Sequence, residues 1–423
     1  MCQRSRLMST LENLHTAAAP SRNSARVSFW NAGHLPTSAG SFLYFDTSFM
    51  IWVLLGALGN HIAGAFGLSA AQKGFMTAIP LLAGSVLRLV LGILADAIGG
   101  KKTALIGMSV TLMPLLGGWL WANSLDRVLV VGMLLGVAGA SFAVALPMAS
   151  RWYPAEHQGL AMGIAGAGNS GTLFATLFAP RLAEAYGWHA VFALAIIPLV
   201  FAFAVFLCFA KDAPGSRRTP QASDYAALLH ETDTYRFCLF YGVTFGGFSG
   251  LISFMPIFLH DQYSASAVLA GDLTSFCVLS GSLMRPLGGW LADRVGGIRV
   301  LAGLYAAIAL LLLGAAQLPS LVAITAILFC VLGFMGLGNG AVFQLVPQRF
   351  AQRVGAMTGL VGAAGGVGGF LFPVILGWFK QYFGSFAFGL VIFAGLAAVA
   401  LVTLWSAQRK WVGIWLAEGG IAK

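Results

Sequence analysis

Long apolar segments, separated by short polar breaks, run along the chain from residue 42 to residue 406. Each segment holds about 20 mainly apolar residues, which is the length that an α-helix needs to cross the hydrocarbon core of a bilayer. The pattern predicts twelve membrane-spanning helices, over 42–65, 74–97, 103–122, 128–149, 159–184, 189–210, 236–259, 268–292, 299–317, 321–346, 355–379 and 384–406. The predicted fold class is therefore an all-α membrane protein.

The longest polar break inside this region covers residues 211–235 and contains both Pro and Gly. Because these residues interrupt helices, we interpret the break as a linker between a first six-helix half, 41–210, and a second, 236–406. Residues 1–40 are polar and mixed, without the apolar stretch of a signal peptide, so we expect a disordered tail there. Residues 407–423 form a second predicted tail.

The end of the second apolar segment is repeated in the eighth. The sequence that begins at Arg88 reappears at Arg285, 197 positions later, with matching Gly, Leu, Ala, Asp and a final Gly pair. A repeat of this length predicts two similar halves. Two parallel halves about an axis along the membrane normal, with a site near the midplane between them, are typical of secondary transporters.

The composition agrees with a membrane protein and excludes several other classes. The chain is 58% hydrophobic and only 9% charged, whereas a soluble domain usually carries about 25% charged residues. The five cysteines are scattered and lack the spacing of a metal or redox motif, so we expect no metal and no cofactor. We find no nucleotide-binding loop and no catalytic triad, and therefore do not expect an enzyme.

The net charge of +10 is informative through its distribution. With the N-terminus in the cytoplasm, most of the 24 lysines and arginines fall in cytoplasmic tails and loops, and only Lys73, Arg127, Arg181 and Lys380 fall outside. The opposite orientation would invert this ratio, against the positive-inside rule. We therefore predict that both termini are cytoplasmic, and we attribute the charge to topology rather than to nucleic-acid binding.

Two arginines lie inside predicted membrane helices. Arg88 precedes the polar residue Asp96 by eight positions, or roughly 12 Å along a helix, which is close to the midplane of a ~30 Å core. Arg285 has the same place in the second half. A guanidinium stays charged, at a cost of roughly 2.5 to 3.5 kcal/mol on insertion scales. Because few intramembrane acids are available as partners, we predict that the two arginines face each other and bind a small anion.

Glycine-rich runs occupy repeat-related places at 159–171 and 355–369. Each glycine costs about 1 kcal/mol relative to alanine within a helix, but it allows helices to approach closely. Packing alone explains any single glycine, and the two runs together suggest surfaces along which helices slide. Asn169 in the first run either donates to an anion or simply caps or bridges helices. The second run has no equivalent Asn, so we expect no equivalent polar contact there.

The loops that begin at Asp96 and Asp293 resemble the loop signature of the major facilitator superfamily. This resemblance is specific because the signature occurs in both halves. We interpret the two carboxylates as gating or folding elements rather than as substrate ligands. A simple polar turn is the plainer alternative.

The glycine runs, the two helix arginines and the stretch Gly338–Gln344 together resemble the nitrate/nitrite porter family within that superfamily. The resemblance covers the whole bundle. It implies the major facilitator fold of twelve transmembrane helices in two six-helix halves, and a carrier for nitrate or nitrite whose two arginines grip the planar anion. It also implies that further residues line the site, namely Asn169, Tyr241, Phe245, Phe142 and Phe49. For the four aromatic residues, ordinary packing is the alternative.

Asp46 lies near the predicted inner end of the first helix. It is a candidate for carrying a coupled proton, and also for an interfacial residue or an arginine partner. Asp272, near the outer end of the eighth helix, is expected to be interfacial.

The sequence leaves three kinds of function open. The first is a nitrate or nitrite carrier that works by alternating access, either as a proton symporter or as a nitrate/nitrite exchanger. The second is a carrier for another small anion, such as formate or a dicarboxylate, although a dicarboxylate would need a longer site. The third is a nutrient sensor that does not transport, which would be expected to carry a folded signalling extension. We expect a monomer in a bacterial inner membrane, surrounded by lipid, with no nucleic-acid partner.

Overall fold

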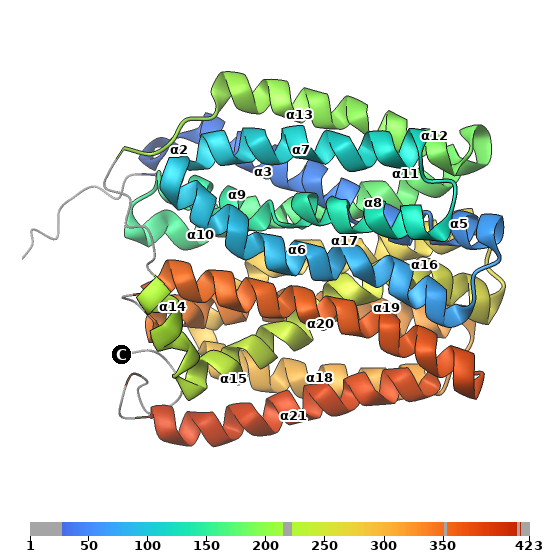
Figure 1. The fold of residues 1–423 in the computed structure, drawn as a ribbon. Helices are drawn as coiled ribbons and strands as arrows, with labels where there is room; N and C mark the ends of the chain where they lie inside the picture. Colours follow the sequence, from blue (N-terminus) through green and yellow to red (C-terminus); the bar gives the residue numbers. More distant parts are fainter. Residues whose placement is uncertain (1–27, 215–221, 351–352, 413–414, 416–423) are drawn as a thin grey trace, which may run out of the picture.

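The computed structural model describes residues 28–214, 222–350, 353–412 and 415. These ranges fold into helices joined by short connections (Figure 1). The helices are α2 (Phe29–Ala32), α3 (Leu35–Trp52), α4 (Leu54–Ala57), α5 (Gly59–Phe66), α6 (Ala70–Ile98), α7 (Gly100–Leu120), α8 (Leu125–Gly139), α9 (Phe142–Ser150), α10 (Ala155–Gly166), the 3-10 segment η1 (Ala167–Ser170), α11 (Gly171–Tyr186), α12 (Trp188–Leu194), α13 (Ile196–Phe209), α14 (Ala222–Leu229), α15 (Thr232–Tyr241), the π segment η2 (Gly242–Gly246), α16 (Gly247–Tyr263), α17 (Ala267–Val295), α18 (Gly297–Ala316), α19 (Leu321–Arg349), α20 (Val354–Phe383) and α21 (Ala387–Trp411).

Ten helical stretches in the described part are long and apolar enough to cross a membrane. They correspond to all of the predicted spans except the first and the fifth. The first span is divided into α3, α4 and α5 by irregular turns at Val53 and Leu58. The fifth is divided into α10, η1 and α11 around the first glycine run. The prediction of twelve spans in an all-α fold is therefore confirmed, and irregular turns or segments divide several of them.

Several helices begin earlier or end later than predicted, because membrane helices continue beyond their most apolar stretch. The first span begins at Leu35, within the predicted tail 1–40, and the His34 side chain accepts the backbone N–H of Thr37 at 3.2 Å to cap it. The predicted linker 211–235 contains α14 and the first turn of α15, and α21 continues to Trp411. Residues 1–27 and most of the second predicted tail lie outside the described residues.

The helices run side by side, so that the bundle has two ends (Figure 1). One end carries α14 and the other carries α5, and we refer to these as the α14 end and the α5 end. Helix α6 of the first half packs along α20 of the second, and α17 of the second half packs along α11 of the first. Gly74 of α6 lies against Pro373 of α20, and Gly271 of α17 lies against Thr176 of α11. Since Gly271 follows Gly74 by the repeat offset of 197, the two halves meet through two equivalent helix pairs.

Large apolar side chains cover the outside of the bundle. Val322, Leu310 and Ile197 are 80%, 70% and 67% exposed, each on a different helix. So many exposed apolar side chains on helices of this length are expected only where lipid covers them. The chain is a multi-pass membrane protein.

Glycine permits a very close contact between α17 and α19. A Cβ atom on Gly288 would overlap the carbonyl group of Leu337, and one on Gly336 would overlap that of Gly281. Only glycine therefore allows the backbones to approach this far.

Replacing Gly288 by Leu is expected to separate α17 from α19 and to destabilise the fold by about 1–3 kcal/mol, the usual cost of overpacking. The measurement is thermal unfolding of the purified protein in detergent. Gly303→Leu on α18 is the matched control, since no atom lies within 4 Å of a Cβ at that position. Equal unfolding temperatures for the two variants would contradict the prediction.

Candidate functional site

Arg88 lies deep inside the bundle and reaches from one half to the other. Its side chain is 1% exposed. Nε donates to the carbonyl of Gly139 at 3.1 Å, within the same half, and Nη1 donates to the carbonyl of Gly362 on α20 at 2.7 Å. Nη2 has no hydrogen-bond partner among the described residues. One donor of this permanently charged group is therefore left for another acceptor.

Arg285 comes to the same place from the second half. It is 5% exposed, and its Nη1 also lacks a partner in the described ranges. The guanidinium carbon lies 5.5 Å from the centroid of the Phe142 ring, and that of Arg88 lies 5.3 Å from the same centroid. The structure thus brings the two arginines together at one aromatic ring. Neither forms a described ion pair with a carboxylate, so the alternative of two structural ion pairs has no support here.

Each arginine is placed against a glycine of the opposite half. Arg88 contacts Gly362 of α20, and a Cβ atom on Gly166 of α10 would lie 3.3 Å from Nε of Arg285. Gly166 and Gly362 are equivalent members of the two glycine runs, 196 positions apart. The glycine runs therefore leave space for the arginine side chains as well as for helix packing.

The four aromatic residues predicted for the site belong to one cluster. Tyr241 stacks on Phe245 with ring centroids 5.0 Å apart, and Phe245 lies 6.3 Å from both Phe142 and Phe49. The π segment η2 begins directly after Tyr241 and contains Phe245. Such π segments occur frequently at functional sites. Contact of these four rings with a substrate stays a prediction.

Three further aromatic residues of the cluster were not predicted. Phe45 packs on Phe49 and Phe142, Trp52 packs on Phe49 and lies 5.3 Å from the Arg88 guanidinium, and Phe343 packs on Phe142 and Tyr241. Phe45 precedes Phe49 by four residues and so shares its helix face, which was a usable signal. Phe343 was present in the Gly338–Gln344 motif, but nothing in that motif indicated which way its ring points.

Asn169 is fully buried in η1. With its amide nitrogen turned toward the neighbouring carbonyls, it donates to Gly166 at 3.1 Å and to Ala167 at 3.2 Å. Gly166 ends α10 and Ala167 begins η1, so these hydrogen bonds fit the alternative of a local cap, and no described hydrogen bond supports a bridge between separate helices. A role for the Asn169 amide in binding an anion stays a prediction.

Asp46 is deeper than the sequence indicated. Because α3 begins at Leu35, Asp46 is eleven residues inside the helix, or roughly 16 Å from its start, rather than near its end. The side chain is 9% exposed, and its carboxylate accepts a hydrogen bond from Ser170 at 2.7 Å. Ser170 directly follows Asn169, so this carboxylate contacts the segment that holds the predicted amide ligand. No described lysine or arginine forms an ion pair with it, so the alternative of an arginine partner has no support.

Comparisons with known proteins agree with this arrangement. The family model described as Major Facilitator Superfamily matches residues 40–373 and 237–410. The chain belongs to the major facilitator superfamily. It is 32% identical over 374 residues to the nitrite extrusion protein of Bacillus subtilis, covering 88% of this chain and 93% of that protein. It is also 32% identical over 360 residues to the probable nitrate/nitrite transporter NarK2 of Mycobacterium tuberculosis, covering 84% and 91% respectively.

The sequence resemblance to the nitrate/nitrite porter family is thereby confirmed. The crystal structure of the human organic anion transporter MFSD10 is similar in fold, with a TM-score of 0.69 at 14% identity, covering 88% of this chain and 99% of that one. As a member of this superfamily the chain is a secondary carrier and not an enzyme.

The two superfamily loop carboxylates, predicted to be equivalent, have different surroundings. Asp96 pairs with Arg151 at 2.7 Å, which ties the end of α6 to the end of α9 within the first half. Asp293 is exposed and forms no described hydrogen bond or ion pair. Arg349 of the second half pairs instead with Asp233 at 2.7 Å. A role of Asp96 and Asp293 in gating remains a prediction. Of the two, only Asp96 has a described ion pair, with Arg151, that a gating motion could break.

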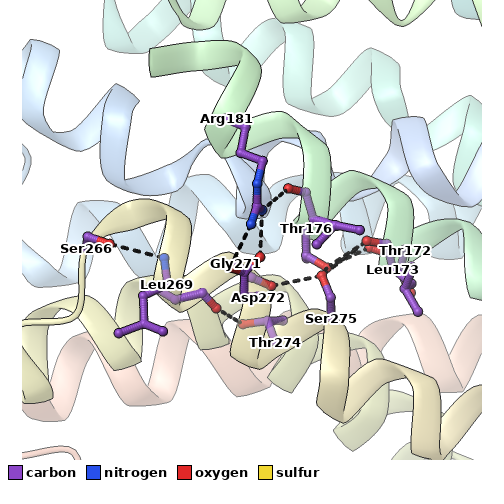
Figure 2. A network of polar contacts seen from close by, with 12 residues as sticks. Thr172, Leu173, Thr176, Arg181, Ser266, Leu269, Gly271, Asp272, Thr274 and Ser275 are labelled. Atoms are coloured by element: carbon purple, nitrogen blue, oxygen red, sulfur yellow. Dashed lines mark hydrogen bonds and ion pairs between the residues drawn. The ribbon is translucent and has the colours of Figure 1, made fainter. Parts of the chain in front are cut away.

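Ion pairs between the halves close the α5 end of the carrier. Lys73 of α6 pairs with Asp261 of α16 at 2.8 Å. Arg181 of α11 pairs with Asp272 of α17 through both guanidinium nitrogens, at 2.6 and 2.8 Å (Figure 2). Asp272 was expected to be merely interfacial. Each of the two ion pairs joins the first half to the second. Separating the halves at this end therefore has to break both ion pairs.

Hydroxyl contacts continue the Arg181 pair toward the middle of the bundle. Figure 2 shows Thr176 of α11 beside Ser275 of α17, and their hydroxyl oxygens are 2.7 Å apart. Ser275 also donates to the carbonyl of Leu173 at 3.2 Å. By contrast, the ion pairs described at the α14 end join side chains within one half. The structure is therefore closed at the α5 end.

Neutralising both acids, as Asp261→Asn with Asp272→Asn, is expected to shift the carrier toward a state that is open at the α5 end. Partly exposed pairs contribute about 0.2–1 kcal/mol each, so opening should become several-fold more frequent. The measurement is the rate at which a maleimide labels a cysteine introduced at Ser275, which is buried in this state. Asp126→Asn is the control, because Asp126 is exposed near the same end and has no described ion pair. An unchanged labelling rate in the double variant would refute the gate assignment.

Proposed function

We propose that this carrier moves nitrate, nitrite or both across the membrane by alternating access. The observation that carries the proposal is the meeting of Arg88 and Arg285 at the Phe142 ring, without a carboxylate partner. The names of the relatives support the choice of anion, since one is a nitrite extrusion protein and another a probable nitrate/nitrite transporter.

The chemistry of the site suits a small planar oxyanion. Three donors are buried and unpartnered among the described residues: Arg88 Nη2, Arg285 Nη1 and Tyr241 Oη. A buried donor without an acceptor costs about 1–3 kcal/mol, and more when it is charged, so an anion that accepts from all three is strongly favoured. An arginine fork can donate two parallel hydrogen bonds to a flat anion, whereas a lysine acts as a point charge. The aromatic rings around the pair exclude water and strengthen these interactions.

Binding of the anion is coupled to the contact between the halves. In this structure Arg88 donates to Gly362, so the arginine itself joins α6 to α20. An entering anion is a stronger acceptor than a backbone carbonyl, because the attraction between two full opposite charges adds to the hydrogen bond. Anion binding therefore competes with this contact and changes the free-energy difference between the states open at either end. The two charges left uncompensated in the empty site oppose switching without substrate.

Asp46 is the residue that we assign to proton coupling, if the carrier works as a symporter. It is buried within α3, and its described hydrogen bond goes to Ser170 beside Asn169. Protonation removes one acceptor charge there, and the carboxyl group then has a hydrogen to donate. A proton on Asp46 can in this way change how η1 presents Asn169 to the anion.

The charge distribution and the bacterial relatives support a proposal for the cellular setting. We place the carrier in a bacterial inner membrane as a monomer, with both termini and the 211–235 linker in the cytoplasm. In this orientation the closed α5 end faces outward.

Replacing Arg88 or Arg285 by Lys is expected to reduce transport by at least tenfold, because the fork geometry is lost while the charge is kept. The measurement is uptake of isotope-labelled nitrate and nitrite into proteoliposomes, with formate as a competitor and internal nitrite present or absent. Arg127→Lys is the control, since Arg127 is partly exposed and its Nη1 donates to the side chain of Asn123, away from the arginine pair. Undiminished uptake in both variants would refute the proposal. So would a native protein that takes up neither nitrate nor nitrite.

Asp46→Asn is expected to abolish any stimulation of uptake by an inwardly directed proton gradient, because the amide cannot exchange a proton. Nitrate/nitrite exchange without a gradient should persist. The measurement is initial uptake with the outside at pH 6 and the inside at pH 7.5, relative to equal pH on both sides. Ser170→Ala is the matched control, since it removes the hydrogen bond and keeps the carboxyl group. A gradient response in Asp46→Asn equal to that of the native protein would exclude Asp46 from coupling.

A further inference from the structure

One buried amide in the centre of the bundle has no role in the function proposed above. The side chain of Asn339 on α19 is fully buried, and neither its Nδ2 nor its Oδ1 has a hydrogen-bond partner in the described part of the chain. A buried amide without partners is destabilising, and native proteins rarely keep one without a reason. Asn339 lies in the Gly338–Gln344 motif. That motif supported the family resemblance as a whole, and no role was assigned to Asn339 itself.

The neighbours of Asn339 along α19 show where its side chain points. A Cβ on Gly340 would overlap α17 at the Arg285 carbonyl, whereas a Cβ on Gly338 would overlap the side chain of Thr244 in η2. The side chains of successive helix residues are rotated by about 100° around the helix axis. Asn339, between Gly338 and Gly340, therefore projects between the direction of η2 and the direction of α17. Helix α17 carries Arg285, and η2 begins directly after Tyr241.

A second contact on the same face of α19 confirms this direction. Phe343 follows Asn339 by four residues, and side chains at this spacing lie on one helix face. The Phe343 ring meets the Tyr241 ring edge-on at 4.8 Å and lies 5.7 Å from the Phe142 ring. The face of α19 that carries Asn339 is therefore turned toward the site.

The depth of Asn339 matches that of the two arginines. Asn339 and Arg285 each lie 18 residues after the first residue of their helices, α19 and α17, which run in the same direction. Asn339 also follows Phe142 by 197 positions, the offset that relates Arg285 to Arg88. It thus occupies in the second half the place that Phe142, the ring touched by both arginines, occupies in the first.

We propose that Asn339 supplies a side-chain amide to the anion site and helps to determine which anion is bound. This inference rests on the proposed function. The Nδ2 group donates to an oxygen of the bound planar oxyanion, and Oδ1 is left as an acceptor for a donor of the same site, such as Arg285 Nη1 or Tyr241 Oη. The second half then has an amide ligand of its own, carried on α19 rather than on the glycine run where Asn169 lies in the first half.

The test compares nitrate binding by the purified full-length protein in detergent, using isothermal titration and the rise in unfolding temperature caused by nitrate. Asn339→Ala is expected to weaken nitrate binding by about tenfold or more, the usual effect of losing a hydrogen bond to a charged group. The unfolding temperature without nitrate should stay the same or rise, because an unpartnered polar group is removed. Asn339→Asp, which has the same shape but carries negative charge and no N–H donor, should weaken binding further.

Ser253→Ala is the matched control, because Ser253 on α16 is also buried with an unpartnered hydroxyl and does not belong to the aromatic cluster. It should bind nitrate as the native protein does. Native affinity in both Asn339 variants would overturn this inference while leaving the proposed function intact. A native protein that binds neither nitrate nor nitrite would overturn the proposed function, and this inference with it. A fall in the nitrate-free unfolding temperature of Asn339→Ala with unchanged affinity would show a structural role instead.

Discussion

Two permanent positive charges, buried where the two halves of the bundle meet, are the constraint on which the rest of this structure depends. A guanidinium cannot escape burial by losing its proton, so its surroundings have to compensate the charge. Arg88 does this with two backbone carbonyls and three aromatic rings, and Arg285 with the ring that it shares with Arg88. Cation–π contacts and carbonyls compensate the charge only partly, and they leave donors free for an anion. A carboxylate in the same place would have neutralised the site permanently.

The need to bring these charges together explains much of the helix packing. Each arginine extends across the interface and lies against a glycine of the other half, Arg88 against Gly362 and Arg285 against Gly166, at equivalent places in the two glycine runs. The same interface closes toward the α5 end through Lys73–Asp261 and Arg181–Asp272. Arg88 and Lys73 both lie on α6, and Arg285 and Asp272 both lie on α17, so the predicted substrate residues and the ion pairs of the α5 end share two helices. A change in one is transmitted to the other through rigid helices rather than through flexible loops.

The two halves are similar in sequence but not identical in chemistry. Asp96 has an arginine partner, whereas its repeat equivalent Asp293 has none in the described part of the chain. Phe142 in the first half corresponds to Asn339 in the second, so an aromatic wall on one side of the site faces an amide on the other. The proposed anion site is therefore asymmetric, although its two arginines, Arg88 and Arg285, occupy equivalent places in the two halves.

The sequence by itself determined the twelve spans, the two halves, the family and the presence of one buried arginine in each half. Hydropathy and permanent charge are properties of short stretches of chain, and a repeat is visible in the letters alone. Only the tertiary structure decided that both arginines lie on the Phe142 ring, that Phe45, Trp52 and Phe343 complete the aromatic cluster, and that Asp46 is deep in its helix. It also decided that Asp272 joins the halves and that the Asn339 amide is buried without a hydrogen-bond partner among the described residues. These features depend on which residues distant in the sequence come into contact, and such contacts are set by the packing of whole helices, which no local pattern specifies.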